Sequence, residues 1–290
     1  MSRLALLSLL LIPACKKHGI EHVRVTQPGD APSAPESDDI ELEASIEDNC
    51  LMGAPVLRYN FGDTTTIGRT GYALGHSNGL KITLWVCEHV TSEELDDGCT
   101  RKDWFKPDPK VPKGSRATKA DYLRSGFDRG HMAPSEDFSS SCDEMRDSFY
   151  LSNMAPQVGA GFNQHVWAYL EAATRGWVET YGEAWIVTGP VFLEDGEGLY
   201  CAETIGGGDV GVPAAFFKAI VVEDDDGPKA LGFILDNKKY STRRDDHGDF
   251  SDYAKTIDEI EARTGIDLFS AFPSHVEGRL ESTDPEPGAW

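Results

Sequence analysis

The chain has 290 residues, of which 40% are hydrophobic and 10% aromatic, and it carries a formal net charge of −22. This composition excludes a wholly disordered chain, because it supplies enough apolar side chains for one large domain or two ordinary ones. The charge argues against a protein that attracts polyanions over its whole surface, because phosphate binding normally needs a basic face.

The first 15 residues have the pattern of a signal peptide. Arg3 makes the start weakly positive, and residues 4–12 form an apolar stretch too short to span a bilayer as a permanent helix. The ending Leu11-Ile12-Pro13-Ala14-Cys15 resembles a bacterial lipobox, in which the cysteine is lipidated, although Pro13 is unusual there. We therefore expect export to a cell envelope, as a periplasmic or outer-surface lipoprotein held to the membrane through Cys15. An ordinary signal peptide, leading to secretion, and a segment of neither kind are the alternatives.

Residues 16–48 show no hydrophobic periodicity and contain three prolines followed by an acidic run. This pattern predicts a disordered acidic spacer. We place the folded domain at 49–275 and expect residues 276–290 to form a flexible tail.

Early in the domain, residues 72–75 and the alternating stretch 81–86 are predicted to be two strands joined at Ser77-Asn78-Gly79. Five cysteines follow Cys15, and export would favour disulfides, with at least one thiol left free or paired between molecules. Cys87 and Cys99 flank the acidic connection 88–98 and are the pair we expect. The cysteine spacings suit no zinc site.

The segment Asp128-Arg129-Gly130-His131 is the most informative in the chain. A histidine with an ordinary pKa near ~6.5 is partly neutral at physiological pH and can take a proton from water. Taken alone, His131 could equally cap a turn after Gly130. Asn163 opens a predicted helix over 163–181; its carbonyl oxygen suits Mg²⁺, while the alternative is a simple helix N-cap.

Along that helix, Asn163, Trp167, Glu171 and Arg175 recur every four residues and share a face. Eight residues correspond to about 12 Å along the axis, so Glu171 is expected to reach an ion at Asn163 only through water. Arg175 can contact substrate or pair with Glu171.

The later elements indicate the fold class. Strands are predicted at 184–190, 216–222 and 230–235, and a helix at 253–264 that ends at Gly265. Residues 206–211 satisfy the dinucleotide-binding pattern G-x-G-x-x-G, but Val212-Pro213 follows where a helix should begin, so we interpret them as a flexible loop. This order favours an α+β fold with a central, mainly antiparallel sheet flanked by helices.

Several segments together resemble the DNA/RNA non-specific endonuclease family, which includes endonuclease G and secreted bacterial nucleases; they are residues 128–131, 149–157, 162–164 and the helix through Arg175. The similarity extends over roughly residues 59–273. It implies the ββα-metal (His-Me finger) fold, with His131 as proton acceptor, Asn163 as the single protein ligand of Mg²⁺, for which Mn²⁺ can substitute, and Arg101 as the residue that stabilises the transition state. The alternative for Arg101, which lies near Trp104, is an ordinary surface residue. Glu171 completes the expected catalytic set.

Arg129 is expected to face the substrate phosphate or to pair with Asp128, and Arg175 is the second expected substrate contact. Between Cys99 and Arg175 eleven basic residues stand against ten acidic ones, so the expected site is nearly neutral although the chain is acidic.

The function we expect is that of a Mg²⁺-dependent endonuclease that cuts DNA and RNA without marked sequence preference. The resemblance implies products with 5′-phosphate and 3′-hydroxyl ends. Two alternatives are a phosphodiesterase of the same fold acting on another phosphate ester, and a non-catalytic surface lipoprotein that binds nucleic acid or a protein.

Overall fold

The computed structural model describes residues 37–195, 198–201 and 203–290. The predicted signal peptide, Cys15 and the predicted spacer up to residue 36 lie outside this range. The helices within it are too short or too polar to span a bilayer.

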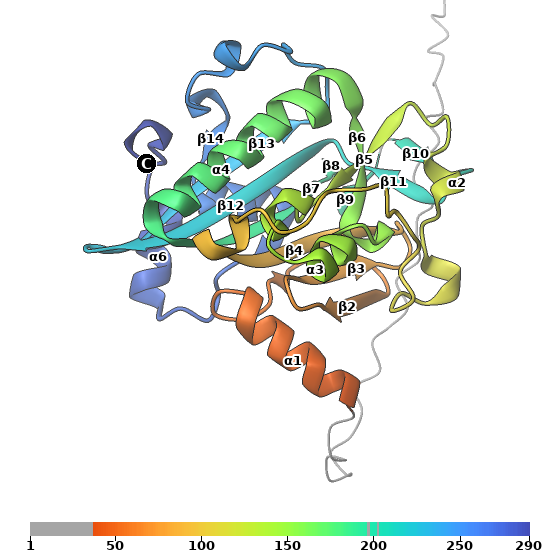
Figure 1. Cartoon of the computed structure of the whole chain (residues 1–290), viewed down its shortest axis with the longest axis horizontal. Helices are drawn as coiled ribbons and strands as arrows, with labels where there is room; N and C mark the ends of the chain where they lie inside the picture. The colour runs from red at the N-terminus through yellow and green to blue at the C-terminus, as the bar shows by residue number, and fades with distance from the viewer. Residues whose placement is uncertain (1–36, 196–197, 202) are drawn as a thin grey trace, which may run out of the picture.

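A seven-stranded antiparallel sheet forms the centre of the molecule (Figure 1). Its order is β14-β13-β12-β7-β4-β3-β2, with every neighbouring pair antiparallel. The apolar runs in its central strands are buried, as expected for strands covered on both faces. The strands are β2 (Thr64–Gly68), β3 (Ala73–Ser77), β4 (Ile82–Thr91), β7 (Glu183–Val191), β12 (Ala215–Asp224), β13 (Gly227–Asp236) and β14 (Ala254–Lys255).

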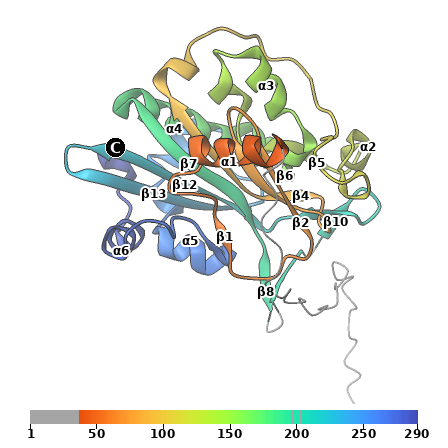
Figure 2. The same cartoon turned by 90° about the horizontal axis from the view of Figure 1, so that it is seen from below.

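Helices cover both faces of this sheet (Figure 2). α3 (Cys142–Ser148) and α4 (Ala168–Tyr181) lie on one side, and α5 (Ile257–Thr264) and α6 (Ser274–Ser282) on the other. α1 (Ser37–Asn49) packs against β2, β3 and β4. The shorter helices are η1 (Ser92–Leu95), η2 (Lys113–Ser115), α2 (Lys119–Tyr122), η3 (Ser135–Phe138), η4 (Leu151–Asn153), η5 (Gly159–Trp167), η6 (Arg244–His247), η7 (Ser251–Tyr253) and η8 (Pro287–Ala289).

Four small antiparallel pairs lie outside the main sheet. β5 and β6 pair although η3, α3 and η4 lie between them in the chain, and the helical run η5–α4 follows β6 directly, so that the three form a strand–strand–helix unit. The pairs are β1 (Val56–Leu57) with β15 (Ile266–Asp267), β5 (Phe127–His131) with β6 (Met154–Val158), β8 (Leu193–Asp195) with β9 (Gly198–Tyr200), and β10 (Glu203–Ile205) with β11 (Val210–Val212).

Most predicted elements are confirmed. The early hairpin is β3–β4, the helix predicted over 163–181 is the run η5–α4, and the three later strands are β7, β12 and β13. The helix expected at 253–264 begins at Ile257, because Thr256 and Glu259 form a capping box, and it ends at Gly265 in the left-handed region. The glycine-rich segment expected to be a flexible loop is instead the turn and the start of the second strand of the β10–β11 hairpin.

The prediction of disorder over residues 16–48 is wrong from residue 37 onward, because α1 occupies that stretch. The helix lacks a strong hydrophobic stripe and is held partly by polar contacts. Ser45 donates to the carbonyls of Arg69 and Tyr72, and Asn49 donates to the carbonyl of Thr70. These bonds satisfy the backbone of a distant turn, which no pattern within the helix predicts.

The prediction of a flexible tail at 276–290 is also wrong. α6 buries Leu280, and the ring of Trp290 meets those of Trp177 and Tyr181 edge-on at 5.9 and 5.5 Å. Aromatic contacts with α4 thus hold the C-terminus in place.

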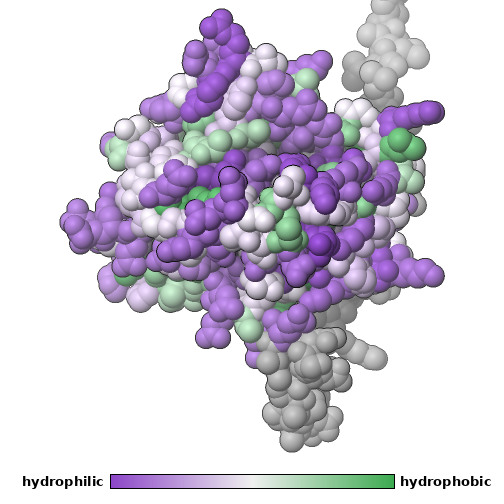
Figure 3. All heavy atoms as spheres, viewed as in Figure 1, coloured by the Kyte–Doolittle hydropathy of each residue, from purple (hydrophilic) through white to green (hydrophobic). Residues whose placement is uncertain are grey.

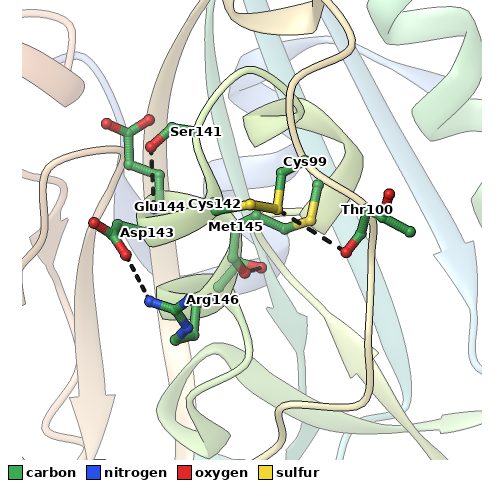
Figure 4. The surroundings of a disulfide bond; sticks show 9 residues. Cys99, Thr100, Ser141, Cys142, Asp143, Glu144, Met145 and Arg146 are labelled. Atoms are coloured by element: carbon green, nitrogen blue, oxygen red, sulfur yellow. Dashed lines mark hydrogen bonds and ion pairs between the residues drawn. A yellow bond between two sulfur atoms is a disulfide. The ribbon is translucent and has the colours of Figure 1, made fainter.

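The expected disulfide between Cys87 and Cys99 is wrong as well. Cys99 is bonded to Cys142 at the start of α3 (Figure 4), and Cys87 is a buried thiol inside β4. Nearness in sequence misled the prediction, because β4 carries Cys87 into the sheet whereas Cys99 lies in the loop beyond its end.

Candidate active site

His131 ends strand β5 of the β5–β6 hairpin. Gly130 before it must lack a side chain, since a Cβ there would lie 2.1 Å from the buried side chain of Gln157 on β6. Beyond the histidine, the buried amide of Asn153 bonds both the N–H and the C=O of Ala133, at 3.0 and 2.9 Å. The hairpin and this pair of bonds hold the backbone on either side of His131.

The imidazole of His131 lies in an aromatic cluster with Phe105 and Phe149. The rings of Phe149 and Phe105 are 4.9 and 5.6 Å away, and the histidine is only 7% exposed. Burial, reinforced by the positive charge of Arg101, lowers the pKa of His131 to about 3. The ring is therefore neutral at physiological pH, and its Nε2 has no hydrogen-bond partner among the described residues.

Two arginines approach the aromatic cluster from different segments. Arg101 forms an ion pair with Glu136 of η3, and its guanidinium lies 5.5 Å from the centre of the Phe149 ring. Arg129 lies 4.0 Å from the centre of the Phe105 ring and makes this cation–π contact instead of the alternative pair with Asp128. The structure therefore places both arginines beside the rings that surround His131.

Asn163 is brought toward β5 by a sharp turn. Gly161 has a φ of 95°, and a Cβ on it would lie 2.8 Å from the carbonyl oxygen of Tyr240, so glycine is required there. Asn163 then donates from Nδ2 to Asp128 Oδ2 at 3.0 Å, and Gln164 donates to the same oxygen at 2.7 Å. Asn163 lies in the first turn of helix beyond the kink at Ala160 and Gly161, and its side chain bonds Asp128 instead of capping the helix.

This arrangement fits a divalent cation at Asn163. The hydrogen bond uses the amide nitrogen, which leaves the carbonyl oxygen as the atom that can bind a metal. Mg²⁺ accepts few protein ligands and completes its shell with water and substrate phosphate. Asp128 thus orients the expected ligand, in the way that outer hydrogen bonds commonly orient metal-binding side chains.

Glu171 and Arg175 come from α4. Arg175 forms its ion pair, at 2.7 Å, with the buried Asp137 of η3 instead of with Glu171. Burial raises the pKa of Glu171 to about 8, opposed by the charge of Lys218 and assisted by that of Asp137. η3 therefore carries two acids, Glu136 and Asp137, that pair with the two arginines Arg101 and Arg175.

Two buried charged residues near this group were not anticipated. Lys218 on β12 is 1% exposed and donates to Thr188 at 2.8 Å. Glu88 on β4 is also 1% exposed, and neither of its carboxylate oxygens has a hydrogen-bond partner among the described residues. Burial, followed by the charge of Asp137, raises the pKa of Glu88 well above its usual range. A single charged residue within an apolar strand, as in Phe216-Phe217-Lys218-Ala219, was the signal that could have identified them.

The sequence model of the DNA/RNA non-specific endonuclease family matches residues 53–275. The chain belongs to this family. The expected resemblance, the α+β fold of the ββα-metal class and the assignment as a nuclease, a hydrolytic enzyme, are confirmed. The alternative of a non-catalytic surface lipoprotein is thereby excluded.

Relatives of this nuclease occur in fungi and animals. Nuclease C1 of Cunninghamella echinulata var. echinulata is 38% identical over 231 residues, a match that spans 76% of this chain and 90% of that protein. A mitochondrial nuclease of Saccharomyces cerevisiae is 38% identical, and the match spans 65% of this chain and 60% of the relative. A chain in the crystal structure of the EndoG/EndoGI complex, which concerns EndoG inhibition, superposes with a TM-score of 0.68 at 28% identity, covering 84% of this chain and 95% of that one.

The expectation of export, to a cell envelope or as a secreted protein, is wrong. Several similar nucleases are mitochondrial proteins, among them that of Saccharomyces cerevisiae and the endonuclease G of Caenorhabditis elegans, which is 34% identical over 75% of this chain and 72% of its own length. The lipid anchor that accompanied this expectation finds no support. A short apolar start followed by a cysteine is weak evidence for export, because several kinds of targeting segment differ only in short stretches of this kind.

Proposed function

We propose that this nuclease is a Mg²⁺-dependent endonuclease that hydrolyses phosphodiester bonds of DNA and RNA. The observation that supports the proposal is that strand β5 carries two of the residues involved. It ends in His131, whose buried Nε2 has no hydrogen-bond partner in the part of the chain that the structure describes, and its Asp128 orients Asn163. A base and the residue that orients a metal ligand are thus three positions apart on one strand.

His131 acts as the general base in this proposal. Its low pKa keeps the imidazole unprotonated, so Nε2 can accept a proton from the attacking water once substrate and water approach. Phe105 and Phe149 pack against the ring and limit its movement. Burial also makes His131 a weaker base, which a substrate phosphate beside it offsets by raising the pKa of the imidazole.

The remaining side chains bind and stabilise charge. Asn163 would hold Mg²⁺ through its carbonyl oxygen, with Mn²⁺ as a substitute; when bound, the ion polarises the scissile phosphate. Arg101, now paired with Glu136, would exchange this partner for the negative charge that develops on the phosphate. Arg129 and Arg175 would contact neighbouring phosphates, and Glu171 would reach the ion through water.

The decisive experiment separates metal binding from proton transfer. Plasmid DNA and RNA are digested with and without a chelator, and Mg²⁺ is titrated calorimetrically in the presence of an uncleavable phosphodiester. Asn163→Ala should abolish both metal binding and cleavage, whereas His131→Ala should keep the metal and lower turnover by about 10² to 10⁴.

Loss of the metal from His131→Ala but not from Asn163→Ala would show that the two roles are reversed. Cleavage of small diesters with nucleic acids left intact would favour the alternative, a phosphodiesterase of the same fold.

A further inference from the structure

Five carboxylates converge on the face of the sheet opposite α4. They come from α5, β15 and α6, and the two helices lie together in Figure 2. Ligand atoms of Asp258, Glu261 and Glu281 all lie within 4.8 Å of one another, and those of Asp267, Glu277 and Glu281 do so too. Glu281 therefore belongs to both groups and joins them.

Glu281 is the observation that separates this cluster from ordinary surface acidity. The residue is only 7% exposed, and its Oε1 is buried without a hydrogen-bond partner among the described residues. Oδ1 of Asp267 is likewise buried, and it too has no hydrogen-bond partner among the residues that the structure describes. Buried carboxylate oxygens without partners are costly, because their desolvation is then uncompensated.

The charges around Glu281 do not balance. Arg58 bridges Glu261 and Asp267, with both contacts at 3.0 Å, and the N–H of Leu268 donates to Glu261 at 2.7 Å. The arginine side chain is 51% exposed and contributes one positive charge against five carboxylates. Backbone and arginine contacts thus orient the cluster, while burial and the charge of Glu261 raise the pKa of Glu281 to about 8, so that a bound cation would take the place of its proton.

We propose that this cluster binds a divalent cation, Ca²⁺, between α5, β15 and α6, separate from the metal expected at Asn163. Ca²⁺ takes six to eight oxygen ligands in flexible geometry, which several carboxylates with one or two oxygens each can supply. Mg²⁺ fits less well, since it demands octahedral geometry and keeps several of its waters. The bound ion would satisfy the unpartnered oxygens of Glu281 and Asp267.

The location of the cluster indicates what the ion would do. Glu277 and Glu281 lie beyond residue 275, where the match to the family ends, whereas the other three acids lie within it. The ion would therefore fasten the C-terminal segment to the nuclease domain. The same segment ends in Trp290, which contacts Trp177 and Tyr181 of α4, the helix that carries Glu171 and Arg175.

The test uses the full chain carrying Asn163→Ala, so that the proposed catalytic ligand is absent, after treatment with a chelator. Ca²⁺ alone is titrated calorimetrically, and thermal unfolding is measured with and without it. We expect one Ca²⁺ per chain and, at about 100 times the dissociation constant, a rise in Tm of about 5 to 10 °C. Adding Glu281→Gln should abolish both effects.

Asp284→Asn is the matched control, since it removes one exposed carboxylate close to Glu281 in the chain and should leave Ca²⁺ binding unchanged. Should Glu281→Gln fail to fold, Glu277→Gln, at a half-buried position, should weaken binding by about tenfold or more, because it removes one proposed ligand. The proposal is overturned if the Asn163→Ala chain binds no Ca²⁺, or if the glutamine variants bind it as tightly as the chain with all five acids.

Discussion

Asp128 connects the two residues on which the proposed chemistry depends. It belongs to the same strand as His131, and its Oδ2 accepts hydrogen bonds from both Asn163 and Gln164. Without this acceptor the amide of Asn163 could rotate and present nitrogen instead of oxygen to a cation. Asp128 is thus a positioning residue for the metal ligand.

Replacing Asp128 by alanine should therefore weaken Mg²⁺ binding by about 10- to 100-fold, the usual effect of removing a partner that orients a metal ligand. Calorimetric titration with an uncleavable phosphodiester measures this change. Asp143→Ala, at an exposed acid paired with Arg146 on α3, is the control and should bind the ion normally. Equal affinity in the two variants would show that Asp128 has no orienting role.

Glu171 links the site to the pH dependence of stability. Its pKa in the folded chain is about 8, against an ordinary value of 4.5, mainly because the carboxyl is buried. Between these two values the unfolded chain releases the proton while the folded chain keeps it. Through this residue, the free energy of unfolding is highest below pH 4.5 and falls as pH rises toward 8.

Glu171→Gln should remove this effect, so that the Tm of the metal-free protein falls less between pH 5 and pH 8 than in the parent. The control is Glu179→Gln, which removes an exposed acid from the same helix and should leave the parent profile intact. If the two variants follow the same profile, Glu171 ionises normally in the folded protein.

The disulfide between Cys99 and Cys142 joins the loop that carries Arg101 to the start of helix α3. Cys99 and Cys142 are 43 residues apart, and the chain between them contains strand β5 with His131. Arg101 follows Cys99 by two residues, so the bond limits how far this arginine can move from the aromatic cluster. The same disulfide thus stabilises the fold and restricts the position of Arg101.

The double variant Cys99→Ser, Cys142→Ser should lower the free energy of unfolding by about 2 to 4 kcal/mol, since closing a loop of this length restricts the unfolded chain. Urea unfolding measures the loss. A reductant should destabilise the parent to a similar degree and leave the double variant unaffected. Peptide mapping without reduction checks the pairing; recovery of Cys99 and Cys142 as separate alkylated peptides would contradict it.

Over the entire protein, the central question is how a chain with a net charge of −22 binds a polyanion. The view in Figure 3 shows a predominantly hydrophilic face with small hydrophobic areas. Two of the three arginines expected to meet phosphate, Arg101 and Arg175, are already paired with acids. Few counterions would therefore leave the nucleic acid on binding.

We accordingly expect affinity for double-stranded DNA to fall gently with salt. Three phosphate contacts correspond to a slope of about −3 in a plot of log affinity against log salt concentration. The measurement uses the cleavage-deficient His131→Ala variant and a short duplex. A slope of about −5, which corresponds to about six phosphate contacts, would show that a basic surface beyond these arginines also binds the DNA.

Local patterns in the amino-acid sequence were sufficient to identify most elements and the family. Alternating and continuous apolar runs predicted the strands, Gly265 marked a helix end, and the segment Asp128-Arg129-Gly130-His131 with Asn163 indicated the nuclease. These features depend on residues close together in the chain, because periodicity and backbone preference are local properties.

Contacts between residues far apart in the chain became visible only in the folded molecule. Arg175 pairs with Asp137 instead of its near neighbour Glu171, and Cys99 is bonded to Cys142 instead of Cys87. The polar contacts that hold α1 and the acids gathered around Glu281 are of the same kind. Strand register, helix packing and burial bring such residues together. These depend on the whole fold, so the neighbours of a residue in the sequence do not determine its partner.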